Sequence, residues 1–394
     1  MSRALCALVA LSALGVAGCV GQAAPVPMDL APIETPVVHQ SPKPELGRPI
    51  AGLTKAEAEA YLQRLAPMVV QRVLTAGERA RLQSEGELAV APIVEAWTKE
   101  PGFAEAARLF VETTLNVSGA KDGVDYSLPG NLAAVLAAQG RPWRELVTSE
   151  LCYARDGSPT ACDGDAPFKG GGLLTTRAYL KSRASRFNLT RASTMMRTFA
   201  CRAYPMENNL QLRAPKAELL GMFQAQSAAE AEAADPRSVS GAANGAACYT
   251  CHGQFAYHSQ LFVKFDEEGH YRASADGVQD PAGELGRSLN GTMASHFAPG
   301  RAANEEAYVF SAKVANLAEA GKALADNPTY VECAAEFFLN WSLGLQWGIV
   351  DYDRNLMSAI AERARKGGDP SLGRIVVELY SDALVMKSLA KKEP

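Results

Sequence analysis

The sequence predicts an all-α protein with two helical domains. Apolar residues recur three and four positions apart through most of the chain beyond residue 53, and glycine and proline interrupt this pattern at intervals. No segment alternates apolar and polar residues as a half-buried strand does, and no internal repeat is present. A length of 394 residues is enough for about two compact domains.

The first predicted domain comprises residues 54–168. Its first helix begins after Thr54, because Thr54 and Glu57 have the spacing of a capping box ahead of an apolar run. Further amphipathic helices are predicted over Ala76–Gln83, Val90–Lys99, Phe103–Leu115, Asn131–Ala138 and Trp143–Leu151.

The second predicted domain comprises residues 169–394 and begins at a glycine run, Gly170–Gly172. Apolar residues at helical spacing follow this run. Helices are predicted from Leu173 through Leu180 and over Leu189–Cys201, Ala214–Glu232, Ala302–Ala325, Tyr330–Leu343, Arg354–Lys366 and Leu372–Leu389.

Residues 1–19 read as an export signal that ends in a lipobox. Met1-Ser2-Arg3 precedes an apolar run from Ala4 to Ala17, which is too short to span a membrane. Val16-Ala17-Gly18-Cys19 resembles a bacterial lipobox, in which the cysteine is acylated and becomes the new N-terminus. Cys19 is therefore the predicted anchor in a lipid bilayer, and the alternative is a secretory signal with an incidental cysteine. We expect an exported lipoprotein, held in the periplasm or at the outer membrane.

Residues 20–53 form a predicted tether between this anchor and the helical domains. The segment is rich in proline and shows no sustained periodicity, so it cannot bury enough apolar surface to fold. Elsewhere the composition is that of an ordinary globular protein, with 21% charged residues and a net charge of -4. Because no block of basic residues is present, nucleic acid is not an expected partner.

The motif Cys248-Tyr249-Thr250-Cys251-His252 predicts a covalent haem c site. Two cysteines three positions apart can each add to a haem vinyl group, and the histidine that follows can bind the iron. We therefore expect one haem on Cys248 and Cys251 with His252 as an axial ligand. Two alternatives remain open, namely a redox-active or structural disulfide and a metal site with further ligands elsewhere.

The second axial ligand of the iron is predicted to be Met293. This residue lies in a glycine-interrupted stretch well beyond the haem motif, and His296 is the alternative. An iron without a second protein ligand is a further possibility, because an open position admits small molecules. His258 is too close to His252 to reach the opposite haem face easily, His270 is expected at the surface, and Met195 and Met196 are expected in the core.

Four cysteines remain for disulfides in an oxidising compartment. Cys152 and Cys162 flank a turn-rich stretch that can bring them together, so they form the first predicted pair. Cys201 and Cys333 are then left to pair with each other, although sequence alone cannot fix connectivity. The alternative is that these four are buried free thiols.

A resemblance to a known family covers much of the chain beyond residue 54. In Phe262–Arg272 a Phe-Asp pair is followed by glycine and by Tyr-Arg, which resembles a group of bacterial cytochrome-c-like domains of unknown function found in large exported proteins. Other fragments similar to this family are Gly172–Thr175, Ala178–Leu180, Asn188–Ala192, Phe199–Arg202, Tyr330–Cys333 and Ser342–Gly344. Two fragments nearer the N-terminus, Pro101–Glu105 and Arg141–Val147, are similar to a helical domain that often accompanies the same families.

This resemblance implies that residues 169–394 form a cytochrome-c-like haem-binding domain and that the protein is exported. It implies no particular substrate, and the sequence departs from the family at His258, where an Asp-Pro turn is usual. The expected function is electron transfer with redox partner proteins. Two alternatives are a haem-dependent oxidoreductase and a structural or binding lipoprotein in a surface complex.

Overall fold

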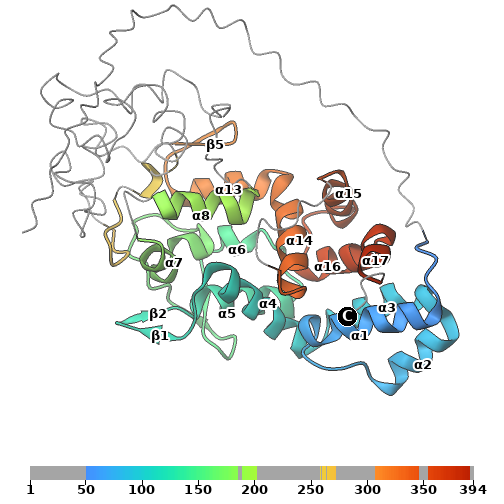
Figure 1. The fold of residues 1–394 in the computed structure, drawn as a ribbon. Coiled ribbons are helices and arrows are strands. Elements are labelled where there is room, and N and C mark those ends of the chain that lie inside the picture. Colours follow the sequence, from blue (N-terminus) through green and yellow to red (C-terminus); the bar gives the residue numbers. More distant parts are fainter. Residues whose placement is uncertain are drawn as a thin grey trace, which may run out of the picture. The chain divides into compact units, whose positions relative to one another are not determined.

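The computed structural model describes residues 50–184, 189–201, 258, 260–262, 264–271, 307–345 and 354–390. By their contacts, the described residues all belong to one compact unit, Leu46–Pro394. Within the described residues the fold is all-α with three short hairpins, which confirms the predicted class (Figure 1).

The helices up to residue 168 largely follow the predicted ranges. They are α1 (Lys55–Val69), α2 (Ala76–Glu85), the 3-10 turn η1 (Gly86–Ala89), α3 (Val90–Trp97), α4 (Pro101–Leu115), α5 (Leu128–Ala138) and α6 (Glu145–Thr148). The capping box at the start of α1 is present as predicted: the Glu57 amide donates to the Thr54 hydroxyl, and the Thr54 amide donates to the Glu57 carboxylate at 2.8 Å. The helix predicted over Trp143–Leu151 is only one turn long, because Ser149 is already extended.

The helices beyond residue 168 include two corrections to the sequence prediction. They are η2 (Gly172–Thr175), α7 (Arg177–Ser182), α8 (Leu189–Ala200), η4 (Gln260–Phe262), α13 (Leu317–Asp326), α14 (Thr329–Ser342), α15 (Arg354–Ala364), α16 (Leu372–Tyr380) and α17 (Ala383–Ala390). The single helix predicted over Leu372–Leu389 is two helices. Asp382 breaks it because its side chain accepts the Leu384 amide at 2.9 Å and so starts a new helix.

The second correction concerns Ala302–Ala325, where one helix was predicted. Residues 307–314 instead form a hairpin of β5 (Ala307–Val309) and β6 (Ala312–Val314), with Phe310 in the left-handed conformation at φ 55°. Strands of three residues are too short to show a clear alternation of polarity. The helix begins only at Leu317, because the Asn316 side chain accepts the Glu319 amide at 3.0 Å.

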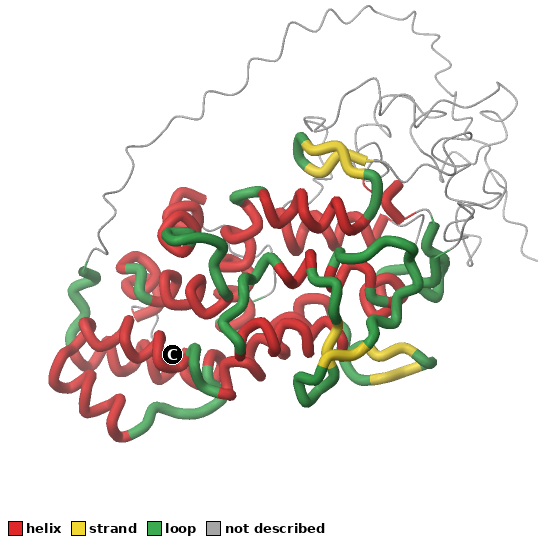
Figure 2. The backbone as a smooth tube through the Cα atoms, turned by 180° about the vertical axis from the view of Figure 1, so that it is seen from behind, coloured by secondary structure: helices red, strands yellow, loops and turns green. Residues whose placement is uncertain are grey.

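Two further antiparallel hairpins complete the described secondary structure. They join β1 (Ala120–Lys121) to β2 (Val124–Asp125) and β3 (Cys152–Tyr153) to β4 (Pro159–Thr160). Figure 2 shows the strands as short segments outside the helices. They join no common sheet, so helix packing builds most of the core, to which the hairpins add Tyr153, Val309 and Val314.

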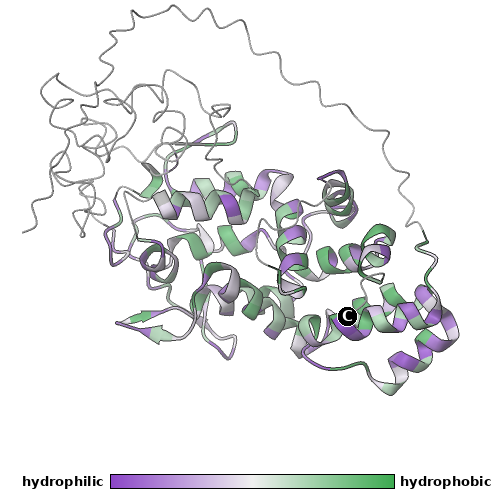
Figure 3. Ribbon diagram, viewed as in Figure 1, coloured by the Kyte–Doolittle hydropathy of each residue, from purple (hydrophilic) through white to green (hydrophobic). Residues whose placement is uncertain are grey.

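Helix α14 lies at the centre of that core. Most of its residues are buried on every side, and the Phe338 ring lies 6.4 Å from Phe103, 5.2 Å from Phe110 and 6.3 Å from Tyr380. A helix that is buried all round is expected in the interior. By contrast α2, in which Leu82 is the buried residue, is largely hydrophilic (Figure 3). Residues before and after position 168 thus contribute to one hydrophobic core, while the domain boundary stays a prediction.

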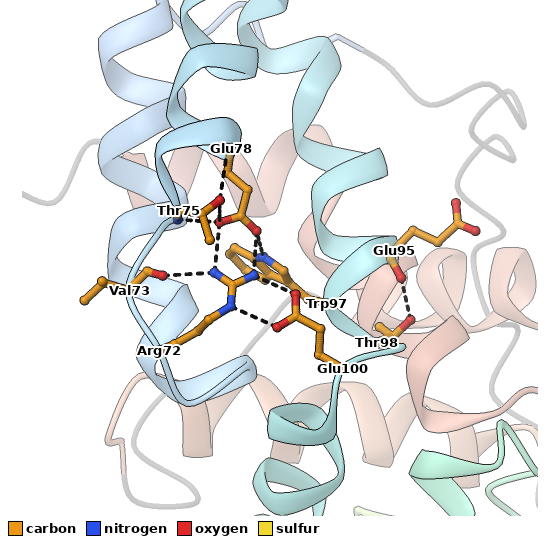
Figure 4. Close-up of polar contacts among 8 residues, drawn as sticks. All are labelled: Arg72, Val73, Thr75, Glu78, Glu95, Trp97, Thr98 and Glu100. Atoms are coloured by element: carbon orange, nitrogen blue, oxygen red, sulfur yellow. Dashed lines mark hydrogen bonds and ion pairs between the residues drawn. The ribbon is translucent and has the colours of Figure 1, made fainter.

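Arg72 joins the first four helices through two carboxylates (Figure 4). Its guanidinium donates to Glu78 of α2 at 2.7 and 2.9 Å and to Glu100, just before α4, at 2.6 and 2.9 Å. The Trp97 indole at the end of α3 also donates to Glu78, at 2.6 Å. Burial raises the pKa of Glu78, but hydrogen bonds from Arg72, Thr75 and Trp97 outweigh it and hold the pKa at about 2.

Candidate functional site

The predicted haem and lipid sites lie outside the described residues. This applies to Cys248, Cys251 and His252, to both candidates for the second iron ligand, Met293 and His296, and to Cys19. The structure does describe chain that flanks the haem motif on both sides, up to Cys201 before it and from His258 after it. These flanks, and the helices that contact them, are the described surroundings of the predicted haem site.

Both predicted cysteine pairs are brought together in the structure. Cys152 and Cys162 form a disulfide at the β3–β4 hairpin, with Cα atoms 5.0 Å apart. Cys201 and Cys333 form a second one, with Cα atoms 5.3 Å apart. The second pair ties the end of α8 to α14, because Cys201 directly follows α8 and Cys333 lies within α14.

Arg191 of α8 holds the described chain that follows the haem motif. Its side chain is fully buried and donates to the carbonyls of Leu180 at 2.7 Å, Phe265 at 2.9 Å and Asp266 at 2.6 Å. Burial lowers its pKa to about 9, which leaves the guanidinium charged at neutral pH. One buried cation thus connects α7, α8 and the segment 264–271.

The Phe-Asp-x-x-Gly-x-Tyr pattern has a structural explanation in this segment. The Asp266 carboxylate accepts the amides of Glu268 and His270, both at 2.9 Å, and so closes a tight turn. Gly269 has φ 80°, and a Cβ there would press against Leu180 of α7. The Phe265 and Tyr271 rings close the base of the turn at 5.3 Å.

The other residues weighed as iron ligands lie in different surroundings. His270 is in that turn, about half exposed, with Nδ1 3.0 Å from the Asp165 carboxylate, so it lies at the surface as expected. Met195 and Met196 are buried in α8 and belong to the core, also as expected. His258 is buried, with 8% of its surface exposed.

A cavity of about 400 Å³ lies between α4, α8 and α14. Its walls include Thr114, Arg197, Thr198, Phe337, Asn340 and Trp341. Asn340 is 2% exposed, and within the described part of the chain neither its amide oxygen nor its amide nitrogen has a hydrogen-bond partner. Sequence reasoning missed this residue, because an asparagine in an apolar helix gives no sign of whether its amide is exposed or buried.

One arginine lines this cavity from the α8 side. Arg197 lines it, and Arg183 lies near enough to be affected by the Arg197 charge. Burial lowers the pKa of Arg183, and the Arg197 charge lowers it further. The side chain of Arg183 donates to the Leu115 carbonyl, at the end of α4, while its buried Nε makes no hydrogen bond to any described residue.

Among the described residues, no three His, Cys, Asp or Glu side chains gather closely enough to hold a metal ion. Within the same part of the chain, no helix combines the length and apolar character needed to cross a bilayer.

Comparison with protein-family models, curated proteins and solved structures found no match to this chain.

Proposed function

We propose that this chain is an exported, lipid-anchored c-type cytochrome with one covalent haem, and that it transfers electrons. The observation that carries the proposal is the pairing of its cysteines. Two disulfides use Cys152, Cys162, Cys201 and Cys333, so the CxxCH cysteines Cys248 and Cys251 are left as a pair with a histidine directly after them. This set of donors fits a haem c.

In this proposal Cys248 and Cys251 hold the haem, and His252 binds the iron. The haem would accept and release one electron, which passes to or from redox partner proteins. Met293 is the proposed second ligand, with His296 as the alternative, and the two differ in effect because a thioether raises the reduction potential relative to a second imidazole. The Cys201–Cys333 disulfide holds the described flank before the haem motif to α14, and the hydrogen bonds of Arg191 hold the flank after it to α8. The similarity to cytochrome-c-like domains noted above is part of the same proposal.

The haem is tested by expressing the chain in a host with cytochrome c maturation. Thioether bonds survive denaturation, so the boiled protein should keep a haem stain through electrophoresis. Cys248→Ala with Cys251→Ala should abolish the stain. The matched control is Cys201→Ala with Cys333→Ala, which also removes two cysteines and should keep it. A stained Cys248→Ala/Cys251→Ala protein, or an unstained wild type, refutes the proposal.

The lipid anchor is tested in the same host. We expect the wild type to partition into detergent and to begin at an acylated Cys19, because acyl chains hold a protein on a bilayer. Cys19→Ala should release the chain from the membrane fraction or block its processing. Mass spectrometry of the N-terminal peptide is the measurement, and an unmodified cysteine in the wild type contradicts the anchor.

A haem-dependent oxidoreductase is the second candidate, and the cavity beside α8 is the observation that favours it. An electron carrier needs no substrate pocket, whereas an enzyme does. The two are separated by exposing the reduced protein to carbon monoxide and by titrating its potential. Ready binding of carbon monoxide indicates an open iron and favours the enzyme. A high potential without such binding favours a methionine-ligated carrier.

A further inference from the structure

The two disulfides in the described part of the chain differ in how far solvent reaches them. Cys201 and Cys333 are buried, at 7% and 0% exposed. Cys152 is also buried, at 1%, but Cys162 is partly exposed, as is most of the loop between them. A thiolate must reach a sulfur atom before it can open a disulfide. Access therefore favours attack at Cys162 and protects the Cys201–Cys333 pair.

Cys152 lies on a strand that the rest of the fold holds in place. Both residues of β3 are buried, and the Asn131 side chain of α5 donates to the Tyr153 carbonyl at 3.2 Å. The disulfide therefore joins Cys162, and the residues that follow it, to a fixed part of the core.

Residues 162–165, here called the strap, hold two separate segments of the chain. The Asp163 carboxylate accepts the amide of Arg177, the first residue of α7, at 2.9 Å. The Asp165 carboxylate accepts the Tyr271 amide, in the turn after the CxxCH motif, at 2.6 Å. The strap thus connects the Cys152–Cys162 disulfide to α7 and to this turn.

The middle of the strap fits closely against the chain that leads into α7. A Cβ on Gly164 would collide with the Thr175 carbonyl oxygen, so the backbones of the strap and η2 are in direct contact. The disulfide joins residues 10 positions apart and so restricts the strap to this place. Once it is open, the exposed loop before the strap no longer limits the motion of the strap.

We propose that the Cys152–Cys162 disulfide is a redox-sensitive latch that a dithiol opens, and that opening it loosens the turn after the CxxCH motif. This device goes beyond the proposed haem function, because none of its residues belongs to the haem motif. Any effect on the haem rests on that proposed function, whereas the effect on the turn does not.

The opening of the latch is a two-electron exchange. One thiolate of the dithiol attacks the sulfur of Cys162, the bond to Cys152 breaks, and Cys152 leaves and takes the proton of the second thiol. The second thiolate then attacks the first sulfur of the dithiol in the mixed disulfide. Cys162 leaves and takes a proton from water, and the dithiol ends as a disulfide. Two electrons and two protons have passed to the two cysteines.

The first test is the order of reduction. The mature chain, made in a host with cytochrome c maturation, is treated with dithiothreitol, and free thiols are blocked with iodoacetamide at intervals. Mass spectrometry of the peptides should show Cys152 and Cys162 reduced at least about tenfold faster than the buried pair. Alkylation of the CxxCH cysteines in the same sample reports a failure of the haem proposal, whatever the order of the other two pairs.

The second test is hydrogen exchange in the selectively reduced chain. The Arg177 and Tyr271 amides should exchange at least about tenfold faster than in the oxidised chain, because their acceptors lie on the strap. Reoxidation should restore slow exchange. The Leu53 amide, which donates to Glu87 at 2.6 Å, is the internal control and should not change.

The variant Cys152→Ser with Cys162→Ser should show the fast exchange without any reductant, and dithiothreitol should not increase it further. The matched control is Asp156→Ala, which alters the loop that the disulfide closes but neither the cysteines nor the strap, and it should exchange as the wild type does. If the serine variant does not fold, the selectively reduced wild type carries the test.

Three outcomes overturn the proposal. The first is reduction of both disulfides at the same rate. The second is unchanged exchange at the Arg177 and Tyr271 amides after selective reduction. The third is an equal acceleration at the Leu53 amide, because that result would show a general loosening of the fold and no particular role for the strap.

Discussion

Two arginines hold different regions of this molecule together by different means. Arg72 lies between the first four helices, is about 29% exposed at its side chain, and is paired with the carboxylates of Glu78 and Glu100. Arg191 is fully buried in α8 and donates to three backbone carbonyls, two of which belong to the turn after the CxxCH motif. Arg72 is thus held by opposite charges, whereas the three hydrogen bonds described for Arg191 all go to backbone carbonyls.

The difference concerns which parts of the chain each arginine connects. The partners of Arg72 lie within 28 residues of it, so its network stabilises one local group of helices. Two carbonyl partners of Arg191 lie 74 and 75 residues away, on the far side of the CxxCH motif. Salt and acid weaken paired charges near the surface, whereas a buried cation bound to carbonyls is shielded from both. The turn after the proposed haem site is therefore held by the interaction that solvent affects least.

The largest expected effect is that of Arg191→Met. It leaves three carbonyls without their buried donor, so we expect a loss of about 3 kcal/mol in the free energy of unfolding, with little dependence on salt. Urea unfolding at low and high salt measures this. Hydrogen exchange at the Glu268 and His270 amides should accelerate. Arg177→Met is the control, because Arg177 also donates to this turn, at the Glu268 carbonyl, but in an exposed position, and a change below about 0.5 kcal/mol is expected. Equal effects of the two substitutions would contradict the role given to Arg191.

A smaller effect, with the opposite response to solvent, is expected for Glu78→Gln. The folded pKa of Glu78 is lowered to about 2 from an ordinary value of 4.5, so its stabilising effect is complete above pH 4.5 and disappears as the pH falls towards 2. At pH 7 we expect the variant to be less stable by about 2 kcal/mol, and the gap should narrow as the pH falls below 4.5 and close as it approaches 2. Urea unfolding at pH 7, 4 and 2.5 measures it. Glu85→Gln is the control, because the Arg81–Glu85 pair is exposed and should contribute almost nothing. A gap that stays constant down to pH 2.5 would show that Glu78 acts through packing.

The success of sequence reasoning depended on how local each signal was. The Thr54 capping box predicted the start of α1 because its two residues, Thr54 and Glu57, are only three positions apart. Asn316 and Glu319 give a similar capping signal, but the predicted helix over Ala302–Ala325 followed the longer periodic stretch instead. That prediction was wrong, because the chain forms a hairpin before Asn316. The Cys152–Cys162 pair followed from the turn-rich stretch between the two residues, and the Cys201–Cys333 pair followed from elimination once Cys248 and Cys251 were assigned to the haem motif.

Features that depend on contacts between distant parts of the chain could not be predicted from the sequence. The burial of Asn340 arises from α4, α8 and α14 meeting around it, and its own helix shows only an isolated amide among apolar residues. Arg191 reads as a surface residue in sequence, because its carbonyl partners carry no side-chain signature. The haem motif itself is the most specific sequence signal, and it stays a prediction.

The Cys201–Cys333 disulfide has a consequence for the covalent topology of the chain. It joins residues 132 positions apart, and Cys248 and Cys251 both lie between them. The stretch with the CxxCH motif is therefore part of a covalent ring. A protease that cuts the backbone once anywhere within this ring opens it without releasing a fragment, so a nicked molecule keeps its CxxCH stretch until the disulfide is reduced.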